Sequence, residues 1–452
     1  MKINMLNLTW KVLFKNTIVL LKKHNCSSKI TKMENVSFNI DGRTCSAEKG
    51  KNLIEAAKQN GIFIPSLCHF KQQNPLGSCR VCTVKLNGRA TAGCTINIDK
   101  GMDIEVNTPE LLDTRKAILE MMFVEGNHFC PSCEKSGDCQ MQKLGYETGI
   151  RYTRFPHLFV ERFIDAKAER IVVNQNRCIK CKRCFEEIKT NDRYQVFNFL
   201  NKGNKTVVTV DYEQEAKLSE SQAEYAMQIC PTGSILVKGK SVSKPFGNRM
   251  FDQGIEGKTI PFNKINKNNS NGQKKRVATT SLAGCFGCHM SLLDIDLGLV
   301  DLIEVVEFNK TPLTDIKKFS KRCNIGIIEG GVSNTHNFEV LRAFRENCDI
   351  LVSVGECAIW GGLPALRNTI PLEDCLNEAY LNSLTSEENE SVIPNHEDIP
   401  KILDKVYSNH EIVKIDYHIP GCPPNSNHIW NVVKNILFEE ELTIAYPEFK
   451  YD

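Results

Sequence analysis

The chain has 452 residues, of which 41% are hydrophobic and 25% are charged, a composition typical of globular protein with about three or four domains. Its formal net charge of +3 gives no strong field for nucleic acid or for an anionic membrane surface. Twenty cysteines are the unusual feature. They stand in tight groups, and we recognise no signal peptide, which favours metal binding in a reducing compartment over a disulfide framework.

Residues 1–33 contain seven lysines and no acidic residue. Their lysines break every apolar run well short of the roughly 18 residues that a membrane span needs, so we expect no membrane span. A basic segment of this kind resembles an organelle targeting peptide, whereas a disordered extension before a start near Met33 is the other interpretation. We therefore expect an intracellular, soluble protein, in the cytoplasm or in the matrix of a mitochondrion-related, hydrogenosome-like organelle.

Residues 34–110 predict a small mixed α+β domain. Alternating apolar residues indicate strands, and Asp41-Gly42 is a hairpin turn signal. The predicted strands cover residues 36–40, 81–86 and 102–106, and the predicted helix starts at residue 52 and ends at Gly61.

The predicted first site lies in this domain and has four cysteines with the spacing Cys-x10-Cys-x2-Cys-x11-Cys. The spacing resembles that of the 2Fe-2S domain at the head of the large iron–sulfur subunit of respiratory complex I and its hydrogenase relatives, and it differs from plant ferredoxin. The resemblance implies one 2Fe-2S cluster on a β-grasp fold. Zinc is the alternative, although zinc sites usually pair two Cys-x-x-Cys knuckles. The four residues are Cys68, Cys79, Cys82 and Cys94.

Residues 111–155 predict a helical segment with an apolar face that includes Leu111, Ile118 and Met122. Its three cysteines are one ligand short of the four that a cubane needs, and an imidazole can supply the fourth. The group resembles the His-plus-three-Cys 4Fe-4S motif of the same subunit family. Complex I usually has three residues between the histidine and the first cysteine. In this chain one residue separates them, and this spacing resembles that of the diaphorase subunit of NAD-linked hydrogenases. This predicted second site consists of His128, Cys130, Cys133 and Cys139.

Residues 156–240 predict a ferredoxin-like domain with one 4Fe-4S cluster. A bacterial ferredoxin repeat would place its fourth cysteine at Ile188, where none stands, and in two-cluster ferredoxins that cysteine ligates the other cluster. The distant Cys230, followed by Pro231, is therefore expected to complete the site. Glu220, Ala223 and Ala226 replace the thiols of a second motif. The predicted third site is Cys178, Cys181, Cys184 and Cys230.

Residues 241–275 predict a flexible linker, and residues 276–452 predict a doubly wound parallel sheet of the flavodoxin-like type, because strands alternate with helices. Cysteines follow three of the strands, and strand ends share one edge of such a sheet. We expect Cys285, Cys288, Cys357 and Cys422 to meet there as the predicted fourth site. Predicted strands cover 276–281, 325–329, 349–355 and 413–419, and predicted helices cover 337–346 and 428–438.

The residues around the fourth site resemble the proximal 4Fe-4S site of a nickel–iron hydrogenase small subunit. Residues 329–331, Glu-Gly-Gly, match an element after that family's second strand. Five other cysteines remain, namely Cys26, Cys45, Cys323, Cys348 and Cys375, and we expect Cys323 and Cys348 to be buried as small hydrophobic residues. The matching motifs are Gly284-Cys285-Phe286-Gly287-Cys288-His289, Gly355-Glu356-Cys357-Ala358 and Pro420-Gly421-Cys422-Pro423-Pro424.

Together the resemblances imply a fusion of two normally separate subunits into one electron-transfer subunit of a hydrogen:NAD+ oxidoreductase. It would hold one 2Fe-2S and three 4Fe-4S clusters and have no catalytic residue of its own. The implied partners are a nickel–iron large subunit and a diaphorase subunit that binds FMN and NAD, since no glycine-rich dinucleotide fingerprint follows a strand. Two alternatives stay open. One is a fused complex I-like NADH dehydrogenase subunit. The cluster-binding subunit of complex I has two adjacent cysteines at the start of its site, whereas in this chain two residues separate Cys285 from Cys288. The other is a zinc-stabilised scaffold.

Overall fold

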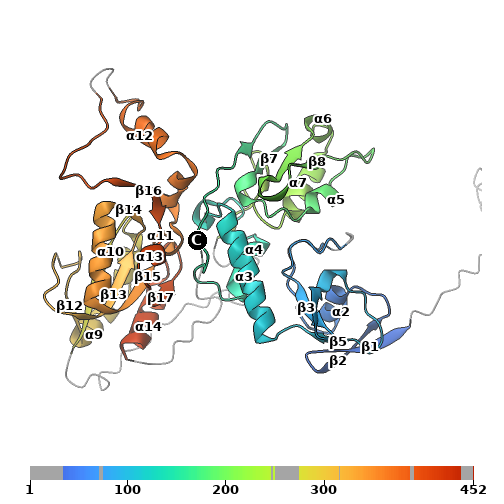
Figure 1. Ribbon diagram of the computed structural model, residues 1–452, viewed down its shortest axis with the longest axis horizontal. Helices are drawn as coiled ribbons and strands as arrows, with labels where there is room; N and C mark the ends of the chain where they lie inside the picture. Colours follow the sequence, from blue (N-terminus) through green and yellow to red (C-terminus); the bar gives the residue numbers. More distant parts are fainter. Residues whose placement is uncertain are drawn as a thin grey trace, which may run out of the picture.

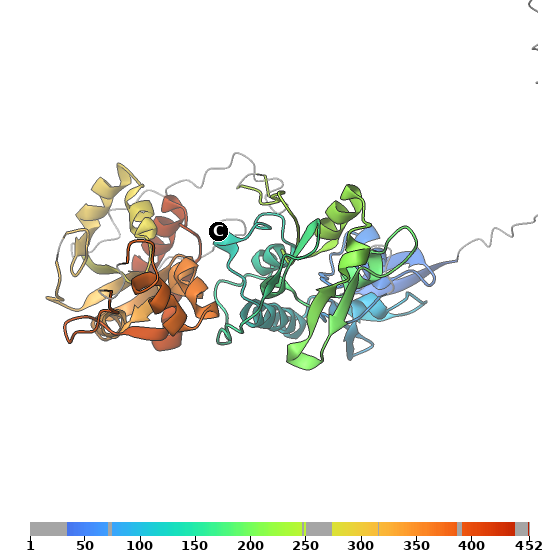
Figure 2. The ribbon, with the colours of Figure 1, turned by 90° about the horizontal axis from the view of Figure 1, so that it is seen from above.

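A computed structural model describes residues 34–70, 75–245, 248–249, 274–314, 316–386, 391–438 and 451. The predicted extension 1–33 and most of the predicted linker lie outside these residues. Figure 1 and Figure 2 agree on the arrangement: the last α/β domain lies on one side of helices α3 and α4, and two smaller domains lie on the other.

The first domain is a five-stranded sheet of order β2-β1-β5-β3-β4 with helix α2 packed against it. Val36, Phe38 and Ile40 alternate with exposed residues and form its core. The predicted hairpin is present. Strand β3 starts at Thr83 rather than at residue 81, because Thr83 bonds back to the Arg80 carbonyl in a turn. The elements are β1 (Asn35–Ile40), β2 (Arg43–Glu48), α2 (Leu53–Gln59), β3 (Thr83–Leu86), β4 (Arg89–Ala92), a 3-10 turn (Gly93–Thr95) and β5 (Asp103–Glu105).

The helical segment consists of two helices with a cysteine loop between them. Helix α3 (Pro109–Glu125) begins at Thr108, whose hydroxyl accepts a bond from Leu111 N at 3.3 Å. Helix α4 (Gln140–Glu147) begins after Cys139, whose sulfur accepts from Gln142 N at 3.5 Å. Only a short 3-10 turn (Cys130–Ser132) interrupts the loop. The chain is therefore not helical through the whole predicted segment.

The third domain has a three-stranded sheet of order β10-β7-β6 and a separate β8–β9 hairpin. A capping box of Ser219 and Gln222 begins helix α7, and Ala223 and Ala226 are fully buried in it. The elements are β6 (Ile164–Asp165), β7 (Ile171–Asn174), α5 (Arg183–Glu187), β8 (Phe197–Leu200), β9 (Val207–Val210), α6 (Tyr212–Glu215), α7 (Glu220–Ile229) and β10 (Ile235–Val237), with 3-10 turns at Gln175–Arg177 and Gly203–Lys205.

The last domain is built on a five-stranded parallel sheet of order β12-β11-β13-β15-β17. One face packs against Leu341 and Phe344 of helix α10, and the other packs against Trp430 of helix α14. The elements are β11 (Lys275–Ser281), α8 (Gly287–Leu293), α9 (Gly298–Val305), β12 (Val306–Phe308), β13 (Cys323–Glu329), β14 (Val332–Asn334), α10 (Thr335–Asn347), β15 (Cys348–Val354), α11 (Glu356–Trp360), a 3-10 helix (Leu363–Thr369), α12 (Leu372–Tyr380), β16 (Ile402–Tyr407), α13 (Asn409–Ile412), β17 (Tyr417–Ile419) and α14 (Ser426–Leu437).

Two features of this domain bear on the sequence predictions. The predicted strand over 413–419 is too long: helix α13 ends at Ile412, residues 413–416 are irregular and lead from it back to the sheet, and β17 covers only Tyr417–Ile419. Cys323 and Cys348 begin neighbouring strands, pair in register and are fully buried, as predicted.

The last domain contacts the α3–α4 segment through aromatic side chains. The Tyr451 hydroxyl donates to Ile150 O at 2.6 Å, and the Tyr451 backbone N donates to the Tyr146 hydroxyl at 2.7 Å. The Tyr451 ring stacks on Tyr146, with centroids 4.5 Å apart, and lies 5.4 Å from Trp360 of α11. Phe123 joins the same core. The two halves of the chain therefore share one buried cluster.

Candidate metal centres

The structure brings the four cysteines of the first site together: Cys82 and Cys94 lie in the first domain's core, and Cys68 and Cys79 lie in the buried cluster shared with the α3–α4 segment. Their exposed fractions run from 0% to 8%. Hydrogen bonds with the thiols of Cys79 and Cys94 lower the pKa of Cys68, and a bond with Cys94 lowers the pKa of Cys82 to about 7. The Cys94 backbone N also donates to Cys82 Sγ at 3.4 Å. Hydrogen bonds that run from Cys79 through Cys68 and Cys94 to Cys82 therefore join four buried thiols into one donor set.

The second site surrounds a cavity lined by His128, Cys130, Cys133 and Cys139. Burial, followed by the charges of Arg177 and Arg162, lowers the pKa of His128 to about 3. Its Nε2 atom is buried and has no hydrogen-bond partner among the described residues. A neutral imidazole with an unused buried nitrogen is the form that binds a metal.

The third site surrounds a second cavity, lined by Cys178, Cys181, Cys184 and Cys230. Cys184 lies in helix α5, and Cys230 directly follows α7. Lys180 and Lys182 adopt left-handed backbone conformations, and Lys180 N donates to Cys178 Sγ at 3.4 Å. The distant Cys230 is thus brought to the Cys178–Cys184 loop, and buried alanines of α7 take the space where a second ferredoxin motif would need thiols.

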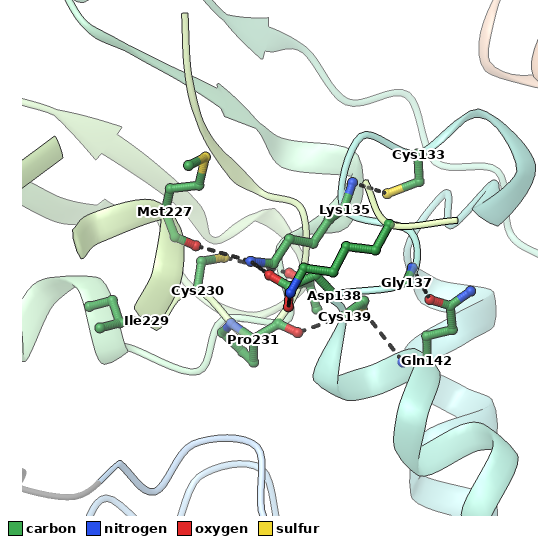
Figure 3. Close-up of polar contacts among 12 residues, drawn as sticks. Cys133, Lys135, Gly137, Asp138, Cys139, Gln142, Met227, Ile229, Cys230 and Pro231 are labelled. Carbon is green, nitrogen blue, oxygen red and sulfur yellow. Dashed lines mark hydrogen bonds and ion pairs between the residues drawn. The ribbon is translucent and has the colours of Figure 1, made fainter. Parts of the chain in front are cut away.

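The second and third sites share a backbone link, which Figure 3 shows. The Pro231 carbonyl accepts from Gln140 N at 2.9 Å and from the Cys139 thiol at 3.6 Å. A side chain at Gly233 would place its Cβ 3.2 Å from Cys133 Sγ and 2.8 Å from Lys135 Cβ. A glycine is therefore required for the two ligand loops to pack this closely.

The fourth site lies at the carboxyl edge of the parallel sheet. Cys285 follows β11, Cys288 lies in α8, Cys357 lies in α11 and Cys422 follows β17. Burial, the Glu329 charge and the thiols of the other three cysteines raise the pKa of Cys288. Gly355 has φ +88°, and a Cβ there would lie 2.3 Å from Cys288 Sγ. Cys285 is exposed, so this site opens to the surface.

A buried polar chain lies beside the fourth site. His289 Nδ1 contacts the Glu329 carboxylate, and His289 Nε2 lies 3.1 Å from Thr279 Oγ1. Thr279 lies 2.6 Å from Thr311. His289 and Glu329 fall within the motifs quoted for the fourth site, whereas Thr279 and Thr311 belong to no motif, and only the fold brings Thr311 to Thr279, which lies 32 residues earlier.

The donor sets fit clusters better than single ions. Among the residues that the structure describes, no group of three or more His, Cys, Asp or Glu side chains has the geometry for one metal ion. Thiol sulfurs, with one imidazole, instead line cavities at the second and third sites. Several backbone N–H groups point at these sulfurs, an arrangement that stabilises anionic iron–sulfur centres.

Four family models match the chain. They are a 2Fe-2S iron–sulfur cluster binding domain (residues 33–109), the NADH-ubiquinone oxidoreductase-G iron–sulfur binding region (115–154), the NADH-quinone oxidoreductase subunit 3 ferredoxin-like domain (168–236) and the NADH ubiquinone oxidoreductase 20 Kd subunit (285–436). Within the described residues, no helix combines the length and apolarity that a bilayer span requires.

Two curated relatives come from Cupriavidus necator. The gamma subunit of NAD-reducing hydrogenase HoxS is 43% identical over 50% of this chain and 97% of its own length. The delta subunit is 53% identical over 40% of this chain and 86% of its own. A chain in a crystal structure of an NAD+-reducing [NiFe]-hydrogenase in the H2-reduced state is 47% identical, with a TM-score of 0.39, over 40% of this chain and 100% of that one.

Proposed function

Because this chain belongs to the family of the gamma and delta subunits of NAD-reducing hydrogenases, we propose that it is an electron-transfer subunit of a hydrogen:NAD+ oxidoreductase. It relays electrons between the nickel–iron site of a partner large subunit and the flavin and NAD site of a partner diaphorase subunit. The observation that carries this proposal is that one chain matches nearly the full length of two subunits, which are separate proteins in Cupriavidus necator.

The cofactors follow from the four ligand sets. The 2Fe-2S domain and the 4Fe-4S domains are family features of this chain, and we assign one 2Fe-2S cluster to the first site and one 4Fe-4S cluster to each of the other three. Bound clusters supply one-electron redox centres. The chain's own residues hold the iron through thiolate and imidazole, exclude water by burial, and donate backbone N–H bonds to the sulfurs.

The domain architecture belongs to the same proposal. The first domain's mixed sheet with a packed helix supports a β-grasp ferredoxin fold over residues 34–110. The strand order β12-β11-β13-β15-β17 supports a flavodoxin-like doubly wound fold over 276–452. We keep 111–155 and 156–240 as the two intervening cluster domains. The exposure of Cys285 supports a fourth site that lies at the surface facing the large subunit.

A reducing intracellular compartment suits these sites, because the cysteines among the described residues are free thiols. The cytoplasm is one such compartment. The matrix of a mitochondrion-related organelle is another, if residues 1–33 act as a targeting segment. Fusing that segment to a fluorescent protein would separate the two locations.

A complex I-like NADH dehydrogenase subunit is the second candidate function, favoured by the descriptions of three matching family models. The two residues between Cys285 and Cys288 argue for the hydrogenase. Anaerobic purification with the native partners, followed by nickel analysis and a hydrogen-uptake assay, separates the candidates. Nickel with hydrogen-dependent NAD+ reduction supports the hydrogenase, and a nickel-free complex without hydrogen uptake contradicts it.

Full loading should give about 14 irons per chain, two from the first site and four from each of the other three. The measurement is iron content per chain after anaerobic reconstitution. A colourless preparation with zinc would instead indicate a structural scaffold. A constant value of about 10 irons would contradict one of the 4Fe-4S assignments.

His128→Ala should destabilise one 4Fe-4S cluster and leave the other three intact, because each site has its own ligands. His128→Cys should keep that cluster and lower its midpoint potential, since a thiolate adds negative charge where imidazole is neutral. Electron paramagnetic resonance during a redox titration measures both effects. His157→Ala is the matched control, because His157 is another half-buried histidine with a pKa lowered to about 3, mainly by desolvation. An unchanged spectrum and potential in both His128 variants would reduce His128 to a packing role.

A further inference from the structure

Arg183 lies between the first and third sites. It starts helix α5, directly before Cys184, and is only 2% exposed. Its Nη2 donates to His69 O at 3.0 Å, and its Nη1 donates to Ile229 O at 3.2 Å. His69 follows the first-site ligand Cys68, and Ile229 precedes the third-site ligand Cys230. One guanidinium therefore bonds the backbone beside a predicted ligand of each site.

Lys135 occupies the corresponding position between the second and third sites (Figure 3). It is 2% exposed and lies between Cys133 and Cys139 in the chain. Its Nζ pairs with Asp138 at 3.0 Å and reaches Met227 O at 3.5 Å, on the turn of α7 that leads to Cys230. The same loop bonds Pro231 O. A buried cation therefore lies on each side of the third site: Arg183 toward the first site and Lys135 toward the second.

Buried charges are costly unless other charges compensate for them. The Arg183 contacts include two carbonyls and the face of Phe70, 5.4 Å from the ring centroid. A cluster with thiolate ligands carries negative charge that grows on reduction, and a nearby cation in a low-dielectric interior stabilises the reduced state. Asp138 already pairs with Lys135, and negative charge on the neighbouring clusters would further favour a buried cation at both positions.

We propose that Arg183 and Lys135 are positioning residues that join the third site to its two neighbours and raise the midpoint potentials of the clusters on both sides. This inference rests on the proposed cluster-binding function. The Arg183 guanidinium acts on the first and third clusters, and the Lys135 ammonium acts on the second and third. Both cations also hold ligand-bearing loops against each other, so the spacing between the sites depends on them.

The test is a redox titration of the full complex, monitored by electron paramagnetic resonance. Arg183→Met should lower the potentials of the first and third clusters, and Lys135→Met those of the second and third, with the fourth unchanged. Arg183→Lys and Lys135→Arg keep the positive charge and should therefore keep the cluster potentials close to the wild-type values. Lys182→Met and Lys244→Met are matched controls: Lys182 is exposed in the same loop, and Lys244, 46% exposed, pairs with the same Asp138. Water should screen both, so their shifts should be smaller.

Asp138→Asn provides a test of opposite sign, which works even where a methionine variant loses iron. It removes the negative partner of Lys135 and should raise the potentials of the second and third clusters. Unmoved potentials in iron-replete variants, or equal shifts in the controls, would overturn the inference while leaving the relay function standing. A wild-type complex without iron–sulfur signals would instead overturn the proposed function itself.

Discussion

Replacing Cys357 with serine should reduce hydrogen-dependent NAD+ reduction to background in the assembled complex and leave NADH-driven dye reduction intact. Cys357 lies in helix α11 at the carboxyl edge of the last sheet, where the fourth site meets the surface. Electrons from a partner nickel–iron site would enter the chain through this site. Electron transfer from NADH through the flavin to a dye does not need the fourth site, so the substitution should abolish the first activity and spare the second.

The matched control is Cys375→Ser, because Cys375 lies in helix α12 of the same domain and belongs to no predicted site. It should keep both activities and the full iron content, whereas Cys357→Ser should lose about four irons. The neighbours Ala358 and Ile359 are fully buried, so the helix has packing contacts that do not depend on the cluster. Full hydrogen uptake by Cys357→Ser would remove the last domain from the electron path.

Local sequence signals predicted the elements that local physics determines. Alternating residues located β1, and strand–helix alternation indicated the parallel sheet, at whose carboxyl edge the structure brings together Cys285, Cys288, Cys357 and Cys422. The ligand roles of these cysteines stay predictions. Strands β14 and β16 were missed, because β14 has only three residues and the two strands pair across about 70 residues of chain, which no local pattern shows.

Long-range polar contacts also escaped the sequence analysis. Nothing in the residues around Arg183 shows that its guanidinium reaches His69, which lies 114 positions earlier. From the sequence alone, the lysines and the arginine near Cys181 are as consistent with a solvated surface as with a role beside a negatively charged cluster. Only the fold separates the buried Arg183 from the exposed Lys182 beside it. Burial of charged side chains depends on tertiary packing, which periodicity does not encode.

The contact between the two halves leads to the second large prediction. Residues 1–268 and 269–452, co-expressed with the partner subunits, should assemble and transfer electrons, because the cut lies in the predicted linker, which contains no predicted ligand. A tether mainly raises the effective concentration of one half near the other, typically to about millimolar. The buried aromatic cluster around Tyr451 should therefore determine how tightly the separated halves bind.

Tyr451→Ala in the split protein should weaken association of the halves about 100-fold. Truncating a buried aromatic ring costs about 3 kcal/mol, and each 1.4 kcal/mol changes an equilibrium about tenfold. Tyr451→Phe keeps the ring stacked on Tyr146 and loses only the bond to Ile150 O, which should cost about 1 kcal/mol. Association is measured by titrating one purified half with the other.

Tyr380→Ala is the control, because Tyr380 lies 39% exposed on helix α12, away from this cluster. It should bind like the wild type. In the unsplit chain, Tyr451→Ala should have a smaller effect, since the covalent link compensates for weaker docking. Wild-type affinity of the Tyr451→Ala half would show that the aromatic contact does not hold the halves together. Tight association without electron transfer in the split wild type would instead show that residues near the cut form part of the electron-transfer interface, and that the two halves do not act as independent subunits.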